Sequence, residues 1–192
     1  MDWLRMDNIM LFFYKANNYI CNKGYDDEVD YIEHIPPLSE QNAEHFLSEF
    51  IYVVLNAGMR EQVARKIYNR FIDTKKLSEI GHPGKRDAIS FALVNYVEWF
   101  ETLQKSDDPV EYLETLPWIG PITKYHLARN IGIDTVKPDR HLVRLAKRFN
   151  FSSPLVMCQE IQKETHDKLG VIDVILWRYC NLTAKHGERY DI

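Results

Sequence analysis

Apolar residues recur at helical spacing along most of this chain, and this periodicity constrains the possible folds more than any other feature of the sequence. Residues 43–55 show it most clearly, because a large apolar side chain returns there every three or four positions. The stripe brings four residues to one helix face: Phe46, Phe50, Val53 and Val54. No segment has the strict two-residue alternation of a half-buried strand, and the chain contains no internal repeat. The fold class is therefore predicted to be all-α.

Capping and turn residues divide the helical pattern. Asn56-Ala57-Gly58 ends the first helix. Asp108-Pro109 and Ser153-Pro154 each place an N-cap residue before a proline at the first helical position, which is a typical helix start. The remaining helices are expected at 61–71 (with Val63, Ile67 and Phe71 in register), 85–103, 109–115, 154–170 and 171–182, with residues 81–84 as a loop.

Length and composition exclude several classes of protein. The 192 residues, of which 45% are hydrophobic, suffice for one compact unit or two small lobes. No stretch approaches the roughly 18–20 apolar residues that a membrane span needs, and the first residues lack the pattern of a secretory signal. The three cysteines lie far apart, which indicates reduced thiols rather than a disulfide framework. We therefore expect a cytoplasmic protein with no membrane partner.

Charge is unevenly distributed along the chain. The net charge is −4, yet between residues 121 and 150 seven lysines and arginines stand against two aspartates. A basic patch on an acidic body binds a polyanion locally while the remaining surface repels it, which orients the encounter. An ordinary solvated helix face also carries such charge. Both interpretations stay open from the charge alone.

The segment from Leu116 to Ala128 predicts a short helix, a tight glycine-containing turn and a second helix that starts directly after it. The amides at this start, of Gly120, Ile122 and Thr123, then lack partners in their own helix and point to open space. A phosphate is the natural ligand of such amides, which hold a nucleic-acid backbone without reading its sequence. The alternative is a plain corner between two helices.

The second informative segment, residues 136–145, surrounds an aspartate that lies sixteen residues after Thr123. Pro138 keeps Lys137 out of helical geometry, and Asp139 then begins a helix. Taken alone, Asp139 is an ordinary N-cap, because aspartate is among the best residues for that position.

Together, the Leu-Pro-Trp-Ile-Gly-Pro turn and the Pro-Asp-Arg-His-Leu-Val-Arg-Leu segment resemble the signature of the helix-hairpin-helix (endonuclease III) superfamily of DNA glycosylases. Residues 49–57 look like the helix that leads to the DNA-penetrating loop of this family. Residues 81–89, with Lys85 and Ala88-Ile89, are similar to the segment that follows. The resemblance runs from about residue 40 to 150 and is most specific in the turn and the aspartate segment.

The resemblance implies two helical lobes, one of residues 39–135 that ends in the hairpin and one of residues 1–38 plus 136–192. Double-stranded DNA with an altered base would lie in the groove between them, and the base would be flipped out because its glycosidic carbon is inaccessible inside the stack. Asp139 would be the catalytic residue, which stabilises positive charge on the sugar and positions water. A monomer on DNA, associated with the nucleoid in a prokaryote, is expected.

The resemblance also implies further binding residues. Lys124, Lys137 and Arg140 would contact DNA, together with the turn amides. In the loop after the 43–55 helix, Met59 would wedge between bases and Arg60 would fill the gap, although Met59 is as well explained by core packing. The backbone carbonyls of three residues match positions that hold a monovalent cation in relatives: Glu114, Leu116 and Ile119.

The positions at which this chain departs from the family pattern restrict which type of glycosylase is predicted. Members that also nick DNA carry a lysine where this chain has Ile122. We therefore predict a monofunctional enzyme that uses water. The alternative is a bifunctional glycosylase/lyase in which Lys137 supplies the amine. Trp118 stands where these hairpins usually have glycine, so either the backbone differs or the indole packs under the turn. Only Cys158 and Cys180 lie near the C-terminal end, which excludes the four-cysteine iron–sulfur cluster of some relatives. No cofactor and no catalytic metal are expected.

The predicted function is therefore base excision by a monofunctional DNA glycosylase that leaves an abasic site. A non-catalytic, structure-specific DNA-binding hairpin protein is the alternative from another class, and Asp139 discriminates between the two. The sequence does not identify the excised base, because pocket shape decides it on related scaffolds.

Overall fold

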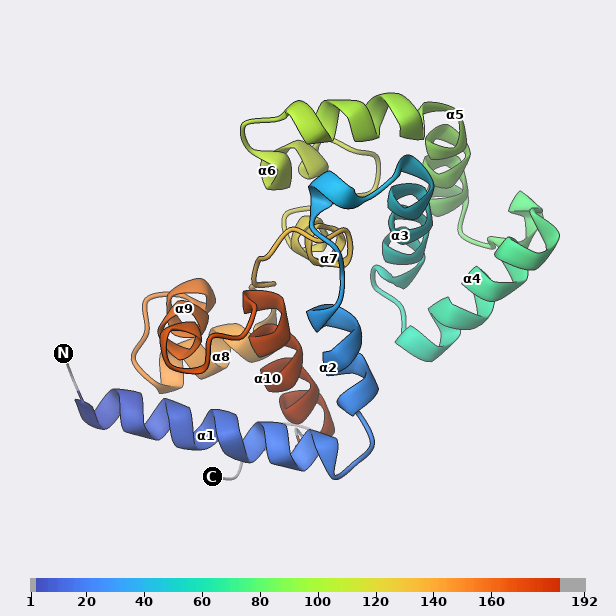
Figure 1. Cartoon of the computed structure of the whole chain (residues 1–192). Coiled ribbons are helices and arrows are strands. Elements are labelled where there is room, and N and C mark those ends of the chain that lie inside the picture. Colours follow the sequence, from blue (N-terminus) through green and yellow to red (C-terminus); the bar gives the residue numbers. More distant parts are fainter. Residues whose placement is uncertain (1–2, 184–192) are drawn as a thin grey trace. The chain divides into compact units, whose positions relative to one another are not determined.

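The computed structural model describes residues 3–183, and within that range it contains ten α-helices, two short 3₁₀ turns and no strand (Figure 1). This confirms the predicted all-α class. The 3₁₀ turns are Leu38–Glu40 and Leu77–Glu79. The helices are α1 (Trp3–Cys21), α2 (Asp26–Glu33), α3 (Ala43–Asn56), α4 (Glu61–Thr74), α5 (Pro83–Lys105), α6 (Pro109–Glu114), α7 (Thr123–Asn130), α8 (Arg140–Arg148), α9 (Pro154–Thr165) and α10 (Leu169–Thr183).

The chain forms two compact units. Unit 1 combines Met1–Ile35 with Asp134–Ile192, so it is built from both ends of the chain, and unit 2 is the continuous segment Pro36–Ile133. The sequence placed these boundaries between residues 38 and 39 and between 135 and 136. None of the described helices is long and apolar enough to cross a membrane.

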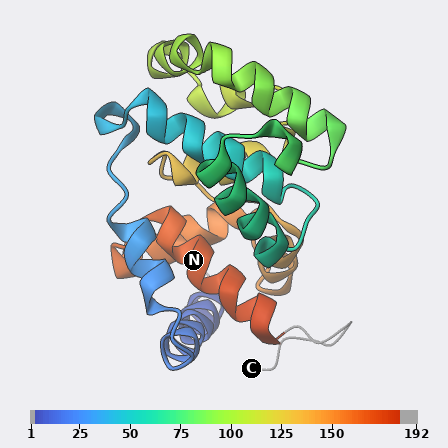
Figure 2. The ribbon, with the colours of Figure 1, turned by 90° about the vertical axis from the view of Figure 1, so that its right-hand side faces the viewer.

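Unit 2 is organised around α3, against which α4, α5 and α7 pack; Figure 1 and Figure 2 show α5 and α4 next to this helix. Asn42 starts α3, because its side-chain oxygen accepts a hydrogen bond from the His45 amide at 2.8 Å. The predicted apolar stripe of α3 is fully buried: Phe46, Phe50, Val53 and Val54. Each of these side chains stabilises the fold by roughly 1.5–3 kcal/mol through the apolar surface it removes from water.

Unit 1 is organised around α10, against which α1, α2, α8 and α9 pack. Every residue of α10 from Leu169 to Leu176 is buried, including a charged one, Asp173. An aromatic cluster joins three elements, since the ring centroid of Phe12 lies 5.4 Å from that of Phe149 and 5.3 Å from that of Tyr179.

Three details of the predicted helices are wrong. Val63 was expected on the buried face of its helix, but it is 47% exposed and Ala64 is buried in its place. The helix that starts at Pro154 ends at Thr165 rather than near residue 170, because His166 adopts the left-handed conformation (φ 63°) that terminates a helix. Residues 81–84 are not all loop, because α5 starts at Pro83 and the His82 ring accepts from the Lys85 amide at 3.4 Å.

Candidate nucleic-acid interface and candidate catalytic residue

The turn between α6 and α7 leaves helix-start amides without a partner. Ile122 precedes α7 and provides no side-chain cap. The Lys124 amide donates to the Gly120 carbonyl at 3.0 Å, but in the described part of the chain no acceptor takes the amides of Ile122 and Thr123. Two donors at the positive end of the α7 dipole are therefore available to an anion.

Gly120 differs from the sequence-based expectation, because its amide does not point to open space. It donates to the Thr123 hydroxyl at 2.7 Å, and that hydroxyl donates back to the Gly120 carbonyl at 3.2 Å. A Cβ added at Gly120 would meet only the Thr123 Oγ1, at 3.8 Å, and its backbone is outside the left-handed region. The fold of unit 2 therefore does not itself require glycine here.

Lys124 is buried and ion-paired. Its Nζ donates to Glu111 Oε1 at 2.5 Å and to Glu114 Oε2 at 2.6 Å, and both glutamates belong to α6. These hydrogen bonds, first from Glu111 and then from Glu114, raise the pKa of Lys124. The geometry gives this lysine a structural role in which it joins α7 to α6. That Lys124 contacts DNA stays a prediction without geometric support.

The far end of α7 is joined to α3. Asn130 Nδ2 donates to Glu49 Oε2 at 2.8 Å, and the Asn130 carbonyl lies 3.2 Å from His45 Nε2. Burial raises the pKa of Glu49, although the Asn130 hydrogen bond opposes that shift. With Lys124 at one end and Asn130 at the other, α7 is held in place along its length, which fixes the direction of its free amides.

The structure shows both the backbone conformation of Trp118 and the packing of its indole. Its backbone is left-handed (φ 67°), the conformation that glycine adopts most readily. Its indole packs outward on the start of α5, edge-to-face with the His82 ring at 5.0 Å. A Cβ at Gly84 would lie 2.5 Å from Trp118 Cζ3, so glycine is needed at residue 84 for this packing. The turn thus keeps a glycine-like backbone while it carries a large side chain.

Lys85 fastens the start of α5 to the end of α3. The side chain is 4% exposed, and its Nζ donates to the carbonyls of Leu55 at 2.7 Å and Ala57 at 2.6 Å. Burial lowers the pKa of Lys85. The 57–60 turn, the start of α5 and the 118–123 turn are therefore linked in unit 2. The sequence did not predict this role, although Lys85 was part of the family resemblance.

In the 57–60 turn, Met59 is half-buried and packs against the core of unit 2, which is the alternative that the sequence left open for it. Arg60 is exposed and precedes α4 without a side-chain cap. Insertion of either side chain into DNA stays a prediction.

The carbonyls proposed to hold a monovalent cation have suitable chemistry. The Leu116 carbonyl accepts the Ile119 amide at 3.1 Å, and no hydrogen bond within the described residues reaches the carbonyls of Glu114 and Ile119. Carbonyl oxygens are the ligands that such ions take from a protein backbone. Across residues 3–183, no three His, Cys, Asp or Glu side chains are grouped as metal ligands.

Asp139, in unit 1, caps α8 through one carboxylate oxygen. Its Oδ1 accepts the amides of His141 at 2.8 Å and Leu142 at 3.1 Å. The side chain is half-buried, and no hydrogen bond from a described residue reaches Oδ2. The capping role that the sequence left open is therefore present, and it uses only half of the carboxylate.

The linker that carries Asp139 is attached to α10 at two points. The Lys137 amide donates to Asp173 Oδ2 at 2.6 Å, and the Gly170 amide donates to Asp134 Oδ1 at 3.0 Å. Asp173 is 1% exposed, and the Lys137 amide compensates part of the cost of burying its carboxylate. Sequence reasoning missed Asp173, since a lone acid in an apolar helix does not reveal its partner.

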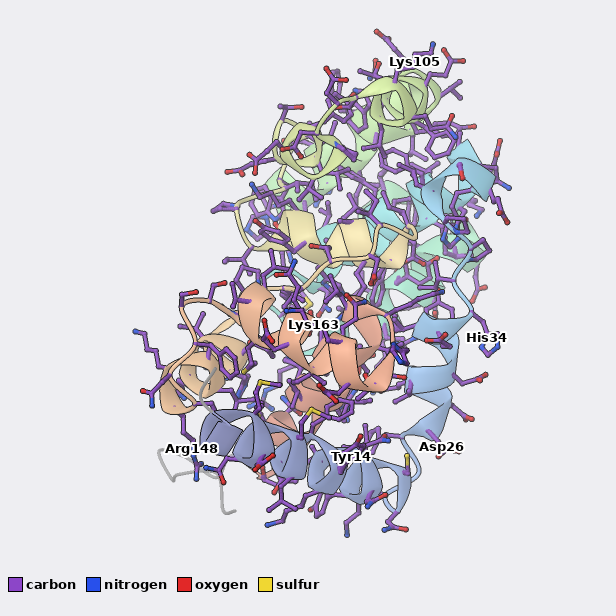
Figure 3. The ribbon with its side chains drawn as sticks, turned by 60° about the vertical axis from the view of Figure 1, so that its left-hand side comes forward. Tyr14, Asp26, His34, Lys105, Arg148 and Lys163 are labelled. Carbon is purple, nitrogen blue, oxygen red and sulfur yellow. The ribbon has the colours of Figure 1, made fainter. Side chains whose placement is uncertain are left out.

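The exposed face of α8 is basic. Arg140, Arg144, Lys147 and Arg148 are exposed, whereas the opposite face, His141 included, is buried. Figure 3 shows the Arg148 side chain at the outer edge of unit 1. Burial lowers the pKa of His141; Asp139 opposes this shift, and Arg140 and Arg144 add to it. Because the buried His141 favours its neutral form, the positive charges of α8 lie on its exposed face.

The predicted site residues thus fall into two groups. The turn residues, Met59 and Arg60 belong to unit 2, while Lys137, Asp139 and Arg140 belong to unit 1. Comparison with models of protein families, with curated proteins and with solved structures finds no match. The function is therefore inferred from the residues themselves.

Proposed function

We propose that this protein is a DNA glycosylase of the helix-hairpin-helix type. More specifically, we propose a monofunctional enzyme that hydrolyses the N-glycosidic bond of a flipped damaged, mismatched or modified base with water and leaves an abasic site. The observation that carries the proposal is Asp139, whose carboxylate is fixed by two amides through Oδ1 at the start of a helix with a basic outer face.

The α6–α7 turn would bind a phosphate of the DNA backbone through the amides of Ile122 and Thr123. A helix start with free amides attracts an anion through both the N–H groups and the helix dipole. The ion pairs of Lys124 with α6 and the Asn130–Glu49 bond hold α7 rigidly, so the two donors need no rearrangement on binding. This contact positions the duplex without reading its sequence.

Asp139 would act on the sugar of the flipped nucleotide. As the glycosidic bond breaks, positive charge develops on the sugar, and a fixed carboxylate stabilises that charge. The hydrogen bonds to Oδ1 hold the carboxylate in one orientation, and Oδ2 is the oxygen left to face the sugar or to accept a proton from the attacking water. The arginines of α8 would bind phosphates near the same nucleotide.

The residues at and next to the position of the nucleophilic lysine in relatives favour a monofunctional mechanism. Ile122, where relatives that nick DNA have lysine, is aliphatic and 42% exposed. Lys124 is a poor nucleophile, because Glu111 and Glu114 keep it protonated. Treatment of the enzyme and a substrate duplex with borohydride is therefore expected to trap no covalent complex. A trapped complex that disappears in Lys137→Met would instead identify the bifunctional alternative.

The direct test is a panel of duplex oligonucleotides, each with one altered base, that are incubated with the protein and cleaved at abasic sites by hot alkali. Strand cleavage at one altered base and none in the unmodified duplex is the expected result. If the protein binds every duplex and releases no base, it is the non-catalytic DNA-binding protein. The capping role of Asp139 is the observation that favours that second candidate.

Gly120→Ala separates DNA binding from folding. The added methyl would meet only Thr123 Oγ1, so thermal stability should change by no more than about 0.5 kcal/mol, as for other substitutions free of clashes. Beside the free amides, however, the methyl would keep a phosphate at a distance, and duplex affinity should fall roughly tenfold, which corresponds to about one charge-assisted hydrogen bond. Fluorescence anisotropy with a labelled duplex measures this affinity. Gly81→Ala, whose added methyl would meet nothing within 4 Å, is the matched control. Equal affinities of the two variants would argue against the turn as a phosphate site.

A further inference from the structure

Trp118 combines a strained backbone with an exposed ring. At a φ of 67° a residue with a Cβ is unfavourable, whereas glycine would adopt this backbone conformation without strain. A large side chain here therefore needs a contact that compensates for the strain. The packing of the indole on Gly84 and His82 compensates for part of this strain, yet 43% of the side chain stays exposed.

The position of this exposed ring is the second observation. Ile122, on the other side of Gly120, is 42% exposed, so two large apolar side chains flank the turn that carries the free amides. Large apolar residues at the surface commonly mark binding sites when they are clustered. In a DNA strand, each phosphate is flanked by deoxyribose rings, whose carbon faces are the nearest apolar surface.

We propose that Trp118 is a DNA-contacting residue whose indole packs against the deoxyribose next to the phosphate bound by the α6–α7 turn. This rests on the proposed function. The ring is held on one side by its packing against the Gly84 backbone and by the edge-to-face contact with His82. Through Lys85, the start of α5 on which the indole packs is also linked to the end of α3 and the 57–60 turn.

The test uses the full-length protein and a duplex with a tetrahydrofuran abasic-site analogue, which resembles the proposed product and needs no knowledge of the excised base. Tryptophan fluorescence is measured during titration for the wild type, Trp118→Phe and Trp99→Phe. Trp99, in α5, packs on Phe50 of α3 and is the matched control. The fluorescence change on binding should vanish in Trp118→Phe and persist in Trp99→Phe. The same change in all three proteins would overturn the proposal.

Affinity distinguishes a DNA contact from a purely structural role. Trp118→Gly should bind the duplex roughly tenfold more weakly, a loss in the range measured for one aromatic stacking contact. The slope of log affinity against log salt should stay unchanged, since no phosphate charge is lost, whereas Arg144→Ala should reduce that slope by about 0.9. Affinity within about twofold of the wild type would overturn the proposal. If Trp118→Gly proves unstable, Trp118→Leu, which keeps an apolar side chain without the aromatic ring, is measured instead with the same expectations.

Measuring base release with the same proteins distinguishes failure of the glycosylase proposal from failure of the Trp118 contact. A wild type whose Trp118 fluorescence responds to duplex but that releases no base would refute the glycosylase and support the contact. A Trp118→Gly variant that releases base and binds like the wild type would refute the contact and leave the glycosylase in place.

Discussion

Asp139→Asn is expected to abolish base release while it leaves the fold and the duplex affinity almost intact. Asparagine is as good an N-cap as aspartate, so its side-chain oxygen can still accept the amides of His141 and Leu142. The negative charge that stabilises the sugar is lost, and so is the proton acceptor. General base action contributes roughly 10²–10⁴-fold to a reaction rate and a single electrostatic contact roughly 10²–10³-fold, so a fall of at least about 10³-fold is expected. Single-turnover assays with alkali cleavage measure the rate.

The matched control is Asp108→Asn, because Asp108 caps α6 in the same manner and its Oδ1 accepts the Glu111 amide at 3.0 Å. This variant should release base at the wild-type rate. Asp139→Ala adds a second comparison, since it removes the cap as well and should cost about 1 kcal/mol of stability. A rate for Asp139→Asn within about tenfold of the wild type would show that residue 139 serves only as a cap, because the electrostatic contribution would then be missing.

The elements of the fold follow from short-range patterns, which is why most of them could be predicted. The apolar spacing of α3 and the cap-plus-proline starts of α6 and α9 depend on residues within one or two helical turns. The errors occurred where tertiary structure decides. His166 stops α9 although it is not glycine, and α4 turns Ala64 and Phe71 rather than Val63 toward the core of unit 2.

The candidate site was predictable only in its local parts. The free amides beside Gly120 and the capping geometry of Asp139 follow from turn and helix-start chemistry. The roles of Lys85, Lys124 and Asp173 did not, because each depends on a partner from another element. Lys124 was counted as part of a basic stretch, yet its charge is matched by two glutamates ten or more residues earlier. A lysine in a sequence does not disclose whether its ammonium faces solvent or an acid.

Gly132→Ala is expected to destabilise the protein by about 3 kcal/mol or more, through strain and steric overlap together. Gly132 follows α7 with a φ of 85°, where any residue with a Cβ is strained. The added Cβ would lie 2.0 Å from the Pro36 carbonyl oxygen and 3.1 Å from the Leu38 amide nitrogen. Both are backbone atoms, so no side-chain rotation relieves the overlap.

The segment around Pro36 or the end of α7 must therefore move, and α7 also carries the phosphate-binding amides at its other end. For a chain of this length, a loss of this size lowers Tm by roughly 6–12 °C, which calorimetry or circular dichroism measures directly. Gly81→Ala is again the control, with no neighbour within 4 Å. Near-equal stability of the two variants would mean that the chain at Pro36 moves aside easily, and that glycine at residue 132 is not needed to hold the end of α7.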